Sequence, residues 1–297
     1  IKGSATVTGN KKVSVAATKF TAPTNAWTIP VPYALESRSS VDVQALRDEL
    51  VAAGVLTGSG NGGNATADMV SVAGGTLPQS SELAGQTVDA FQIGKYEVTW
   101  GEWNEVRDWA VAHGYTDLAN IGGGKSNHSP VTHVSWYDVV KWSNARSEKE
   151  GMTPVYQVSG ATYKTGQSVP TLNASANGYR LPSEKEWEWA ARGGVSSKGY
   201  TYSGSNTVSE VGWTSENSSD GTKAVGTKAA NELGIYDMSG NVWEWCEDVA
   251  DTSDRRIRGG SWGSGADYAA VANRDAYNIP HYRFSNFGFR LVRSSGN

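Results

Sequence analysis

The chain has 297 residues and a formal net charge of −4, with 26 Lys and Arg against 30 Asp and Glu. This length allows two ordinary domains or one large domain with an appendage, and no basic cluster indicates nucleic acid or a membrane surface as a partner. No apolar run approaches the ~20 residues that span a bilayer. The 35 Gly, 12 Trp and 13 Tyr predict many turns and a core of large aromatic side chains.

The first 67 residues differ in texture from the rest. Alternating residues at 6–8 and 13–15 predict two short strands joined by a hairpin turn, and 41–53 predicts an amphipathic helix. The glycine-rich stretch 57–64 is typical of a linker. We therefore expect an N-terminal appendage, 1–67, and a main domain, 68–297. A signal or lipid-attachment segment removed before Ile1 would tether the protein to a membrane.

Helix and strand signals are clear in the first half of the main domain. Residues 69–76 predict a strand that runs into a glycine turn, and 91–99 a second strand. Three helices are then predicted, each with a capping residue before it. They are 100–113 after Thr99, 136–150 after Ser135, and a helix that follows Ser183 and ends by Arg192.

The C-terminal stretch 258–293 is unlike the rest of the chain. Its opening, 258–262, and its close, 287–292, predict strands, the latter with apolar residues on one face and Gly or Arg on the other. From Gly263 to Phe287 there is no Lys, Glu, Gln, Met or Trp. The interior mixes Tyr, Ser, Asn, Gly and Asp as antibody paratopes do, which predicts a ligand-binding surface on a rigid scaffold.

The predicted binding residues are Asp267, Tyr268, Asp275, Tyr277, Asn278, His281, Tyr282, Phe284 and Ser285. The four aromatic side chains would be anchors, and the polar ones would adapt hydrogen bonding. Their neighbours Asn273, Arg274, Pro280, Arg283 and Asn286 are expected to be framework residues with pairing or turn roles.

The order of motifs resembles the formylglycine-generating enzyme family. The matching segments are MVSVAGGT, FQIGKYEVTWGEW, SPVTHVSWYDVVKW, YRLPSEKEWEWAARGG, NELGIYDMSGNVWEWCED and RGGSW with GFRLVR, and they cover roughly 69–293. Each motif alone is weak, but together they exclude chance. The resemblance implies an α+β domain with the family's variant of the C-type lectin fold, much irregular structure and long ordered loops.

The resemblance also implies a chemistry that this chain lacks. The family oxidises a substrate cysteine through two cysteines that bind copper, and the matching positions here are Ser264 and Ala269. The single cysteine, Cys246, lies in another motif, and we expect it to be a small packed residue. An iron-dependent branch of the family would need a histidine cluster, but the four histidines lack metal-ligand spacing, and His133 is expected to be packed. We therefore expect no copper, no iron and no enzymatic activity.

Calcium is the one metal that the resemblance favours. By similarity to the family, its ligands would be the side chains of Asp237 and Glu244 and the carbonyl oxygens of Gly240 and Val242. These are the hard oxygen donors that Ca²⁺ prefers, and the ion would be structural, holding a loop. The alternative is that both acids cap turns or pair with an arginine.

Among proteins of this fold, the chain resembles variable proteins that retroelements diversify. In those systems adenines in template codons are mutated, and codons that keep a third-position pyrimidine cannot encode the five residue types missing from 263–287. The expected function is therefore a non-enzymatic, receptor-like or adhesin-like protein on a bacterial cell surface, secreted or anchored as an outer-membrane lipoprotein. Its ligand would be a protein or glycan on another surface. Two alternatives stay open: an enzyme of this fold with altered chemistry, and a carbohydrate-recognition or structural domain.

Overall fold

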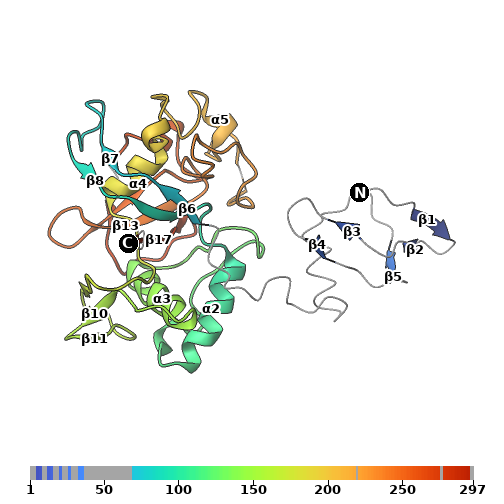
Figure 1. The fold of residues 1–297 in the computed structure, drawn as a ribbon, viewed down its shortest axis with the longest axis horizontal. Coiled ribbons are helices and arrows are strands. Elements are labelled where there is room, and N and C mark those ends of the chain that lie inside the picture. Colours follow the sequence, from blue (N-terminus) through green and yellow to red (C-terminus); the bar gives the residue numbers. More distant parts are fainter. Residues whose placement is uncertain are drawn as a thin grey trace. The chain divides into compact units, whose positions relative to one another are not determined.

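The chain divides into two compact units, Ile1–Ala65 and Thr66–Asn297, close to the boundary expected after residue 67. The computed structural model describes residues 69–218, 220–274 and 277–294, together with the backbone of five short strands before residue 37 (Figure 1). The helix expected over 41–53 and the linker expected over 57–64 lie outside the described residues.

The first unit contains a small antiparallel sheet. β1 (Ala5–Thr8) pairs with β2 (Lys12–Val15), and β2 also pairs with β5 (Tyr33–Glu36). A separate pair joins β3 (Phe20–Thr21) to β4 (Ala26–Trp27). The hairpin predicted around residues 6–15 is therefore confirmed.

The second unit has short strands, a few helices and long loops, as an α+β domain of this type requires. Its strands are β6 (Met69–Val72), β7 (Gly75–Thr76), β8 (Thr87–Val88), β9 (Phe91–Gly94), β10 (Tyr156–Val158), β11 (Ala161–Thr162), β12 (Thr171–Leu172), β13 (Trp243–Val249), β14 (Arg255–Arg258), β15 (Tyr277–Asn278), β16 (Phe287–Gly288) and β17 (Val292–Ser294). Its α-helices are α2 (Trp100–Ala112), α3 (Trp136–Lys149), α4 (Glu184–Ala191) and α5 (Val208–Val211). Three short 3-10 helices are η1 (Thr116–Leu118), η2 (Gly194–Ser196) and η3 (Ala266–Ala269). No helix of the described residues is long and apolar enough to cross a membrane.

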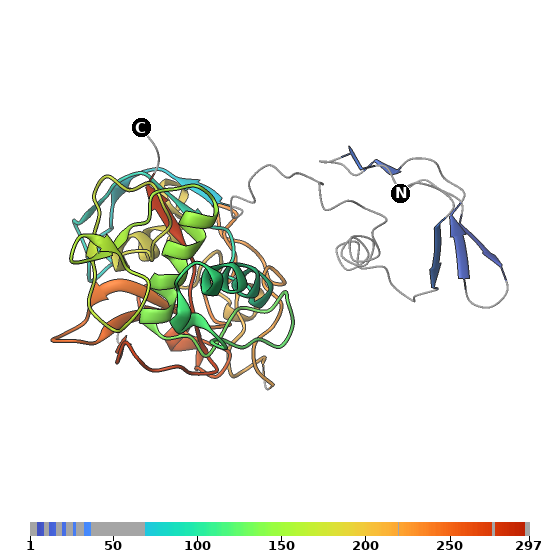
Figure 2. The ribbon, with the colours of Figure 1, turned by 90° about the horizontal axis from the view of Figure 1, so that it is seen from below.

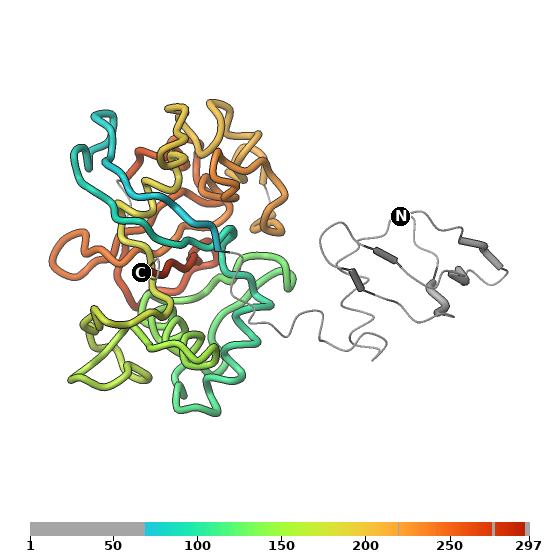
Figure 3. The backbone as a smooth tube through the Cα atoms, in the orientation of Figure 1, coloured from blue at the N-terminus to red at the C-terminus, as the bar shows by residue number. Residues whose placement is uncertain are grey.

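Two sheets organise this unit. In the first, of order β17-β9-β6, β9 pairs on one side with β6 at the start of the unit and on the other with β17 at its end, so both ends share one sheet (Figure 3). In the second, of order β15-β14-β13-β16, β13 and β14 form an antiparallel hairpin, and β16 runs parallel to β13 with Phe287 opposite Trp243. Figure 2 shows this hairpin in orange, and the orange-red chain that follows it runs along the lower edge of the unit. The predicted binding segment thus begins and ends on one sheet.

Side-chain caps fix where the main helices begin. Thr99, Ser135 and Ser183 each accept a hydrogen bond from the third residue of the helix, whose acidic side chain binds back to the cap. These reciprocal pairs satisfy backbone N–H groups that the first turn would otherwise leave without partners. The three predicted helices are confirmed, and α2 and α3 lie against each other (Figure 1).

Tryptophan dominates the core, as its abundance predicts. Trp103, Trp136, Trp142, Trp187 and Trp245 are fully buried, and the rings of Trp103 and Trp142 stack with centroids 5.4 Å apart between α2 and α3. The five indole N–H groups donate to the carbonyl oxygens of Ile121, Cys246, Trp103 and Val134 and to the Glu244 carboxylate. A buried donor without an acceptor would cost free energy, so these bonds let the core use indole rings.

The bounds predicted for the two strands that bracket the C-terminal segment, 258–262 and 287–292, are wrong. β14 ends at Arg258, because Gly259 and Gly260 take left-handed φ values of 95° and 73°. The predicted strand 287–292 is split into β16 and the start of β17, and all six of its residues are buried. Alternation fails because Arg290, expected on the outer face, is buried through a pairing with Glu244.

Candidate binding surface

The C-terminal segment leaves β14 through a tight glycine turn. A Cβ atom at Gly259 would lie 3.0 Å from the Trp187 ring, and one at Gly260 would lie 3.0 Å from the backbone nitrogen of Ala269. Only glycine accommodates this approach together with a positive φ. The turn therefore brings η3 directly against the end of β14.

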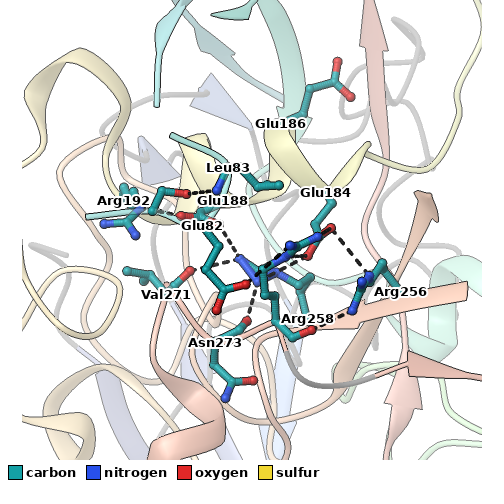
Figure 4. Close-up of polar contacts among 12 residues, drawn as sticks. Glu82, Leu83, Glu184, Glu186, Glu188, Arg192, Arg256, Arg258, Val271 and Asn273 are labelled. Carbon is teal, nitrogen blue, oxygen red and sulfur yellow. Dashed lines mark hydrogen bonds and ion pairs between the residues drawn. The ribbon is translucent and has the colours of Figure 1, made fainter. Parts of the chain in front are cut away.

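A buried charge network holds the middle of the segment (Figure 4). The guanidinium of Arg258, fully buried, binds Glu188 of α4 at 2.9 Å and donates to the carbonyl oxygens of Val271 and Asn273. Burial lowers the pKa of Arg258, although the nearby carboxylates favour its charge. Because a buried charge must be paired, Arg258 fixes the path of the backbone at 271–273.

Two further arginines hold the segment by ion pairs. Arg274 binds Glu184 at 2.9 Å, and Arg283 binds both oxygens of Asp138 at 2.6 and 2.9 Å. The hydrogen bonds that Arg283 donates to the Asp138 carboxylate raise the pKa of Arg283. Asp138 also caps α3, so the helix start and the segment share one carboxylate. The pairing role expected for these two arginines is observed.

The scaffold also binds the backbone of the segment. Four N–H groups of the scaffold donate to carbonyl oxygens of the segment. The pairs, donor first, are Trp136 with Pro280, His133 with Phe284, the Trp262 indole with Ser285, and Trp243 with Asn286. A backbone carbonyl accepts a hydrogen bond whatever side chain its residue bears. This part of the attachment is therefore indifferent to the identity of the side chains at 284 and 285.

Most of the predicted binding residues are exposed. Asp267, Tyr268, Tyr277, His281, Tyr282, Phe284 and Ser285 are exposed, Asn278 is half-buried, and Asp275 lies outside the described residues. Tyr268 and Tyr277 are each 49% exposed, and Tyr282 and Phe284 are each 41% exposed. In the described part of the chain, every exposed Tyr or Phe side chain belongs to this segment, and no Trp is exposed.

Three of these residues form an exposed aromatic cluster, His281, Tyr282 and Phe284. The rings meet edge to face, with centroids 4.8 Å apart for His281 and Tyr282 and 5.6 Å apart for Tyr282 and Phe284. Phe284 in turn contacts buried Phe287 at 4.9 Å. The cluster is thus supported from below by the core, and its outer surface is free.

The remaining two tyrosines have other supports. Tyr268 packs edge to face on Trp243 with centroids 5.9 Å apart, and Tyr277 lies at the edge strand β15 with the Arg256 guanidinium 6.0 Å from its ring centre. No ring contact joins them to the exposed aromatic cluster among the described residues. The structure therefore brings together part of the predicted set and distributes the rest.

The positions that resemble the family's catalytic cysteines hold no thiol. Ser264 and Ser261 share a hydrogen bond between their hydroxyl oxygens, 2.9 Å apart, and Ala269 is fully buried. Cys246 is fully buried in β13, which confirms the expected packed residue, and burial raises the pKa of its thiol. Thiolate chemistry at this place is excluded by composition.

A buried acidic cluster surrounds the predicted calcium residues. Burial, reinforced by the charges of Asp237 and Glu244, raises the pKa of Glu97 well above its ordinary value. Burial also raises the pKa of Asp237 to about 6. Burial opposes the charge of Arg290, but its pair with Glu244 raises the pKa of the guanidinium. Glu97 was missed by the sequence analysis, where it passed as an ordinary polar position of a strand.

The predicted calcium donors differ in what the structure leaves free. Glu244 is engaged by Arg290 at 2.7 Å through each oxygen and by the Trp187 indole at 2.8 Å, which is the arginine pairing held open as the alternative. Asp237 accepts from the backbone of Gly226 with one oxygen, and its other oxygen is buried without a partner. No three His, Cys, Asp or Glu side chains among the described residues are grouped as a metal set. Glu244 is thus committed to Arg290, whereas one oxygen of Asp237 is buried without a partner, and calcium binding stays a prediction.

His133 corrects another expectation. It is exposed rather than packed, and it has a left-handed φ of 56°. Its ring nitrogen lies 3.1 Å from the hydroxyl of Thr132, and its backbone N–H binds Phe284. The sequence around His133 did not indicate its contact with Phe284, because the two residues are 151 positions apart.

The comparisons with known proteins agree with the motifs and the fold. The model of the sulfatase-modifying factor enzyme 1-like domain matches residues 58–295. The chain belongs to this family. Its fold is the α+β, C-type lectin-like fold of the formylglycine-generating enzymes.

Relatives of different kinds share this domain. The chaperone protein LppX of Paenibacillus barcinonensis is 36% identical over 275 residues, which cover 80% of this chain and 94% of LppX. A formylglycine-generating enzyme of Thermomonospora curvata is 32% identical over 157 residues, 47% of this chain and 41% of the enzyme. An inactive formylglycine-generating enzyme 2 of Bos taurus is 35% identical over 137 residues, 40% of this chain and 45% of the relative.

Two solved structures resemble the chain over most of their length. CarF has a TM-score of 0.68 and 30% identity and covers 77% of this chain and 99% of its own. Treponema denticola variable protein 1 has a TM-score of 0.64 and 30% identity, and the match covers 76% of this chain and 95% of that protein. The family therefore includes inactive relatives and a variable protein built on the same scaffold.

Proposed function

We propose that this protein is a non-enzymatic binding protein whose ligand-binding surface is formed by the exposed side chains of residues 267–285. The observation that supports it most is the placement of the exposed Tyr and Phe side chains, all of which lie in this segment among the described residues. A folded protein normally buries such groups, and aromatic side chains are enriched at binding hot spots. The likeness to Treponema denticola variable protein 1 supports the same function.

The framework supports a surface whose side chains can vary. Arg258 and Arg283 hold the segment through scaffold carboxylates, and scaffold N–H groups hold its carbonyl oxygens. The predicted binding side chains therefore have few structural duties, and the scaffold holds the described parts of the segment in place before the ligand arrives. A preordered surface loses little conformational entropy on binding.

The test uses peptides selected from a phage-displayed random library on the immobilised protein. Tyr277→Ala and Tyr282→Ala should weaken binding of the selected peptides at least about fivefold, a loss of ~1 kcal/mol that most interface residues do not reach, without lowering the melting temperature. Leu172→Ala, which removes an exposed apolar group on β12, is the control and should change neither. Peptides indifferent to both tyrosine substitutions would contradict the proposed function.

Diversification by a retroelement is the second part of the proposal. It rests on the absence of five residue types from 263–287, which template codons with a third-position pyrimidine would require. The genome tests it directly. A neighbouring reverse transcriptase gene and a near-identical template repeat that differs only at adenines would establish it, and their absence would contradict it.

The partner and the location belong to the same proposal. The partner would be a protein or glycan on another cell, and the protein would be displayed on a bacterial surface, tethered through a lipid or secreted. Protease treatment of intact cells that removes the protein would support display. Retention inside the cells would contradict it.

A client-binding chaperone is a second candidate. The observation that favours it is the 36% identity to the chaperone LppX across 94% of that protein. Such a chaperone would suppress aggregation of a chemically unfolded model protein at stoichiometric ratio, and Tyr282→Ala would weaken the suppression. It would also select peptides that are apolar without a common motif, whereas a specific receptor would select a motif.

Structural calcium is kept as a proposal at Asp237. It is supported by the buried, unpartnered Asp237 oxygen and opposed by the commitment of Glu244 to Arg290. If the ion binds, Ca²⁺ should raise the melting temperature above that in EDTA, and Asp237→Leu should remove the difference. Equal melting temperatures of the wild-type protein in both conditions would show that Arg290 alone balances the acids.

A further inference from the structure

Two residues outside 263–287, His133 and Trp262, bind the backbone beside the exposed aromatic cluster. His133 follows the loop before α3, and Trp262 follows the glycine turn after β14. His133 donates its backbone N–H to the carbonyl of Phe284 at 2.9 Å, and the Trp262 indole donates to the carbonyl of Ser285 at 3.4 Å. They therefore hold two consecutive peptide groups of the segment.

Part of the ring surface of each residue remains exposed to solvent. His133 is exposed, and the polar contact of its ring is with the neighbouring Thr132 hydroxyl. The Trp262 ring is half-buried, in contrast to the fully buried tryptophans of the core. Both rings therefore present surface to any molecule that covers Phe284 and Ser285.

His133 has a backbone conformation that is uncommon for a residue other than glycine. Its φ of 56° lies in the left-handed region, and its ring lies close to the backbone, since a Cβ at Gly123 would be 3.3 Å from its ring nitrogen. Asparagine or glycine would adopt this conformation more easily.

From these contacts we infer that His133 and Trp262 form a constant part of the ligand surface, which the variable side chains surround, and that the ligand is a protein. This inference rests on the proposed binding function. The charge of the region favours a protein with neutral apolar or aromatic groups, because the Arg283 guanidinium is already bound by both Asp138 oxygens. The two arginines of 263–287, Arg274 and Arg283, are both paired with carboxylates, so the described part of this segment offers a polyanionic ligand no unpaired arginine. The His133 imidazole supplies rigid contact area with hydrogen-bonding capacity, and the Trp262 ring supplies contact area alone, because its N–H is donated to Ser285.

The inference predicts that ligands of different specificity share a contact. Peptides selected separately on the wild-type protein and on a Tyr282→Ser, Phe284→Ser variant should differ in sequence, yet both sets should depend on His133. His133→Asn removes the imidazole, keeps the backbone N–H that binds Phe284, and suits the left-handed conformation. It should weaken most peptides of both sets at least about fivefold.

A matched control is His113→Asn. His113 is also exposed, but it lies at the end of α2 and stacks on Trp109 with ring centroids 3.8 Å apart. This substitution should leave all affinities unchanged. If His133→Asn does not fold, Trp262→Leu provides the second variant, because it keeps an apolar side chain and loses the indole.

The outcomes separate this inference from the proposed function. Loss of binding on Tyr282→Ala together with full binding by His133→Asn and Trp262→Leu would overturn the constant surface and leave the binding function standing. Insensitivity to Tyr282→Ala as well would overturn both. Saturable binding on a glycan array that depends on His133, with no peptide selected, would overturn the protein ligand.

Discussion

Two groups of side chains a few residues apart in sequence have opposite roles in this protein. Arg290 and its partner Glu244 are fully buried, and the guanidinium makes four hydrogen bonds within the scaffold. Tyr282 and Phe284 are exposed and contact their neighbours through ring edges. The comparison teaches that the fold is specified by buried charged and indole groups, which frees the segment between them for recognition.

The largest effect should follow from removing Arg290. In Arg290→Met the Glu244 carboxylate stays buried without its partner, so we expect a loss of about 3–5 kcal/mol in the free energy of unfolding. Urea unfolding measures it. Lys149→Met breaks an ion pair whose Glu105 partner is 71% exposed, and should cost less than about 1 kcal/mol. Similar losses of unfolding free energy in the two variants would show that the buried Arg290 pair matters no more to stability than an exposed ion pair.

The pH dependence of stability should reveal the buried acids. The folded-state pKa of Asp237 is raised to about 6, so the folded protein binds this proton more tightly than the unfolded chain does. Its contribution is therefore present at low pH and is lost as pH rises from about 4 to about 6, by about 3 kcal/mol at most. Unfolding free energies of wild type and Asp237→Asn, measured across this window, should converge below it and diverge above it. A constant difference would contradict the raised pKa.

Arg283 should show an intermediate effect, because its side chain is 40% exposed while Asp138 is buried. We expect Arg283→Gln to lower the free energy of unfolding by about 1–2 kcal/mol, since a charge-assisted pair is lost. Hydrogen exchange should quicken at amides near 282–287 and stay unchanged in α4. Uniform change across the unit would mean that Arg283 acts on global stability alone.

The smallest effect should come from the exposed aromatic cluster. Tyr282→Ser removes a side chain that is 41% exposed and should change stability by no more than about 0.5 kcal/mol. Phe287→Ser, only five residues away, empties a buried site and should cost several times more. Thermal unfolding of the pair compares them. Equal losses would show that the cluster is core and that binding must be sought elsewhere.

The sequence predicted those parts of the fold that local chemistry decides. The caps Thr99, Ser135 and Ser183 were readable because the cap and the residue it binds are three positions apart. The binding surface was also predicted locally, because the residue types of 263–287 are themselves typical of exposed recognition loops. Long-range pairing was not readable. The burial of Arg290 depends on Glu244, 46 residues earlier, and the backbone N–H of His133 binds a carbonyl 151 residues later.

The central claim is that the scaffold, and not the exposed side chains, determines the fold of the C-terminal segment. It can be measured by randomising each position from 263 to 287 in a displayed library and sorting for protease resistance. The account predicts that Tyr268, Tyr277, Tyr282, Phe284 and Ser285 accept nearly all residue types, whereas Arg274, Arg283 and Phe287 accept few. Equal intolerance at both sets would mean that the exposed aromatics are required for folding, and would contradict the claim.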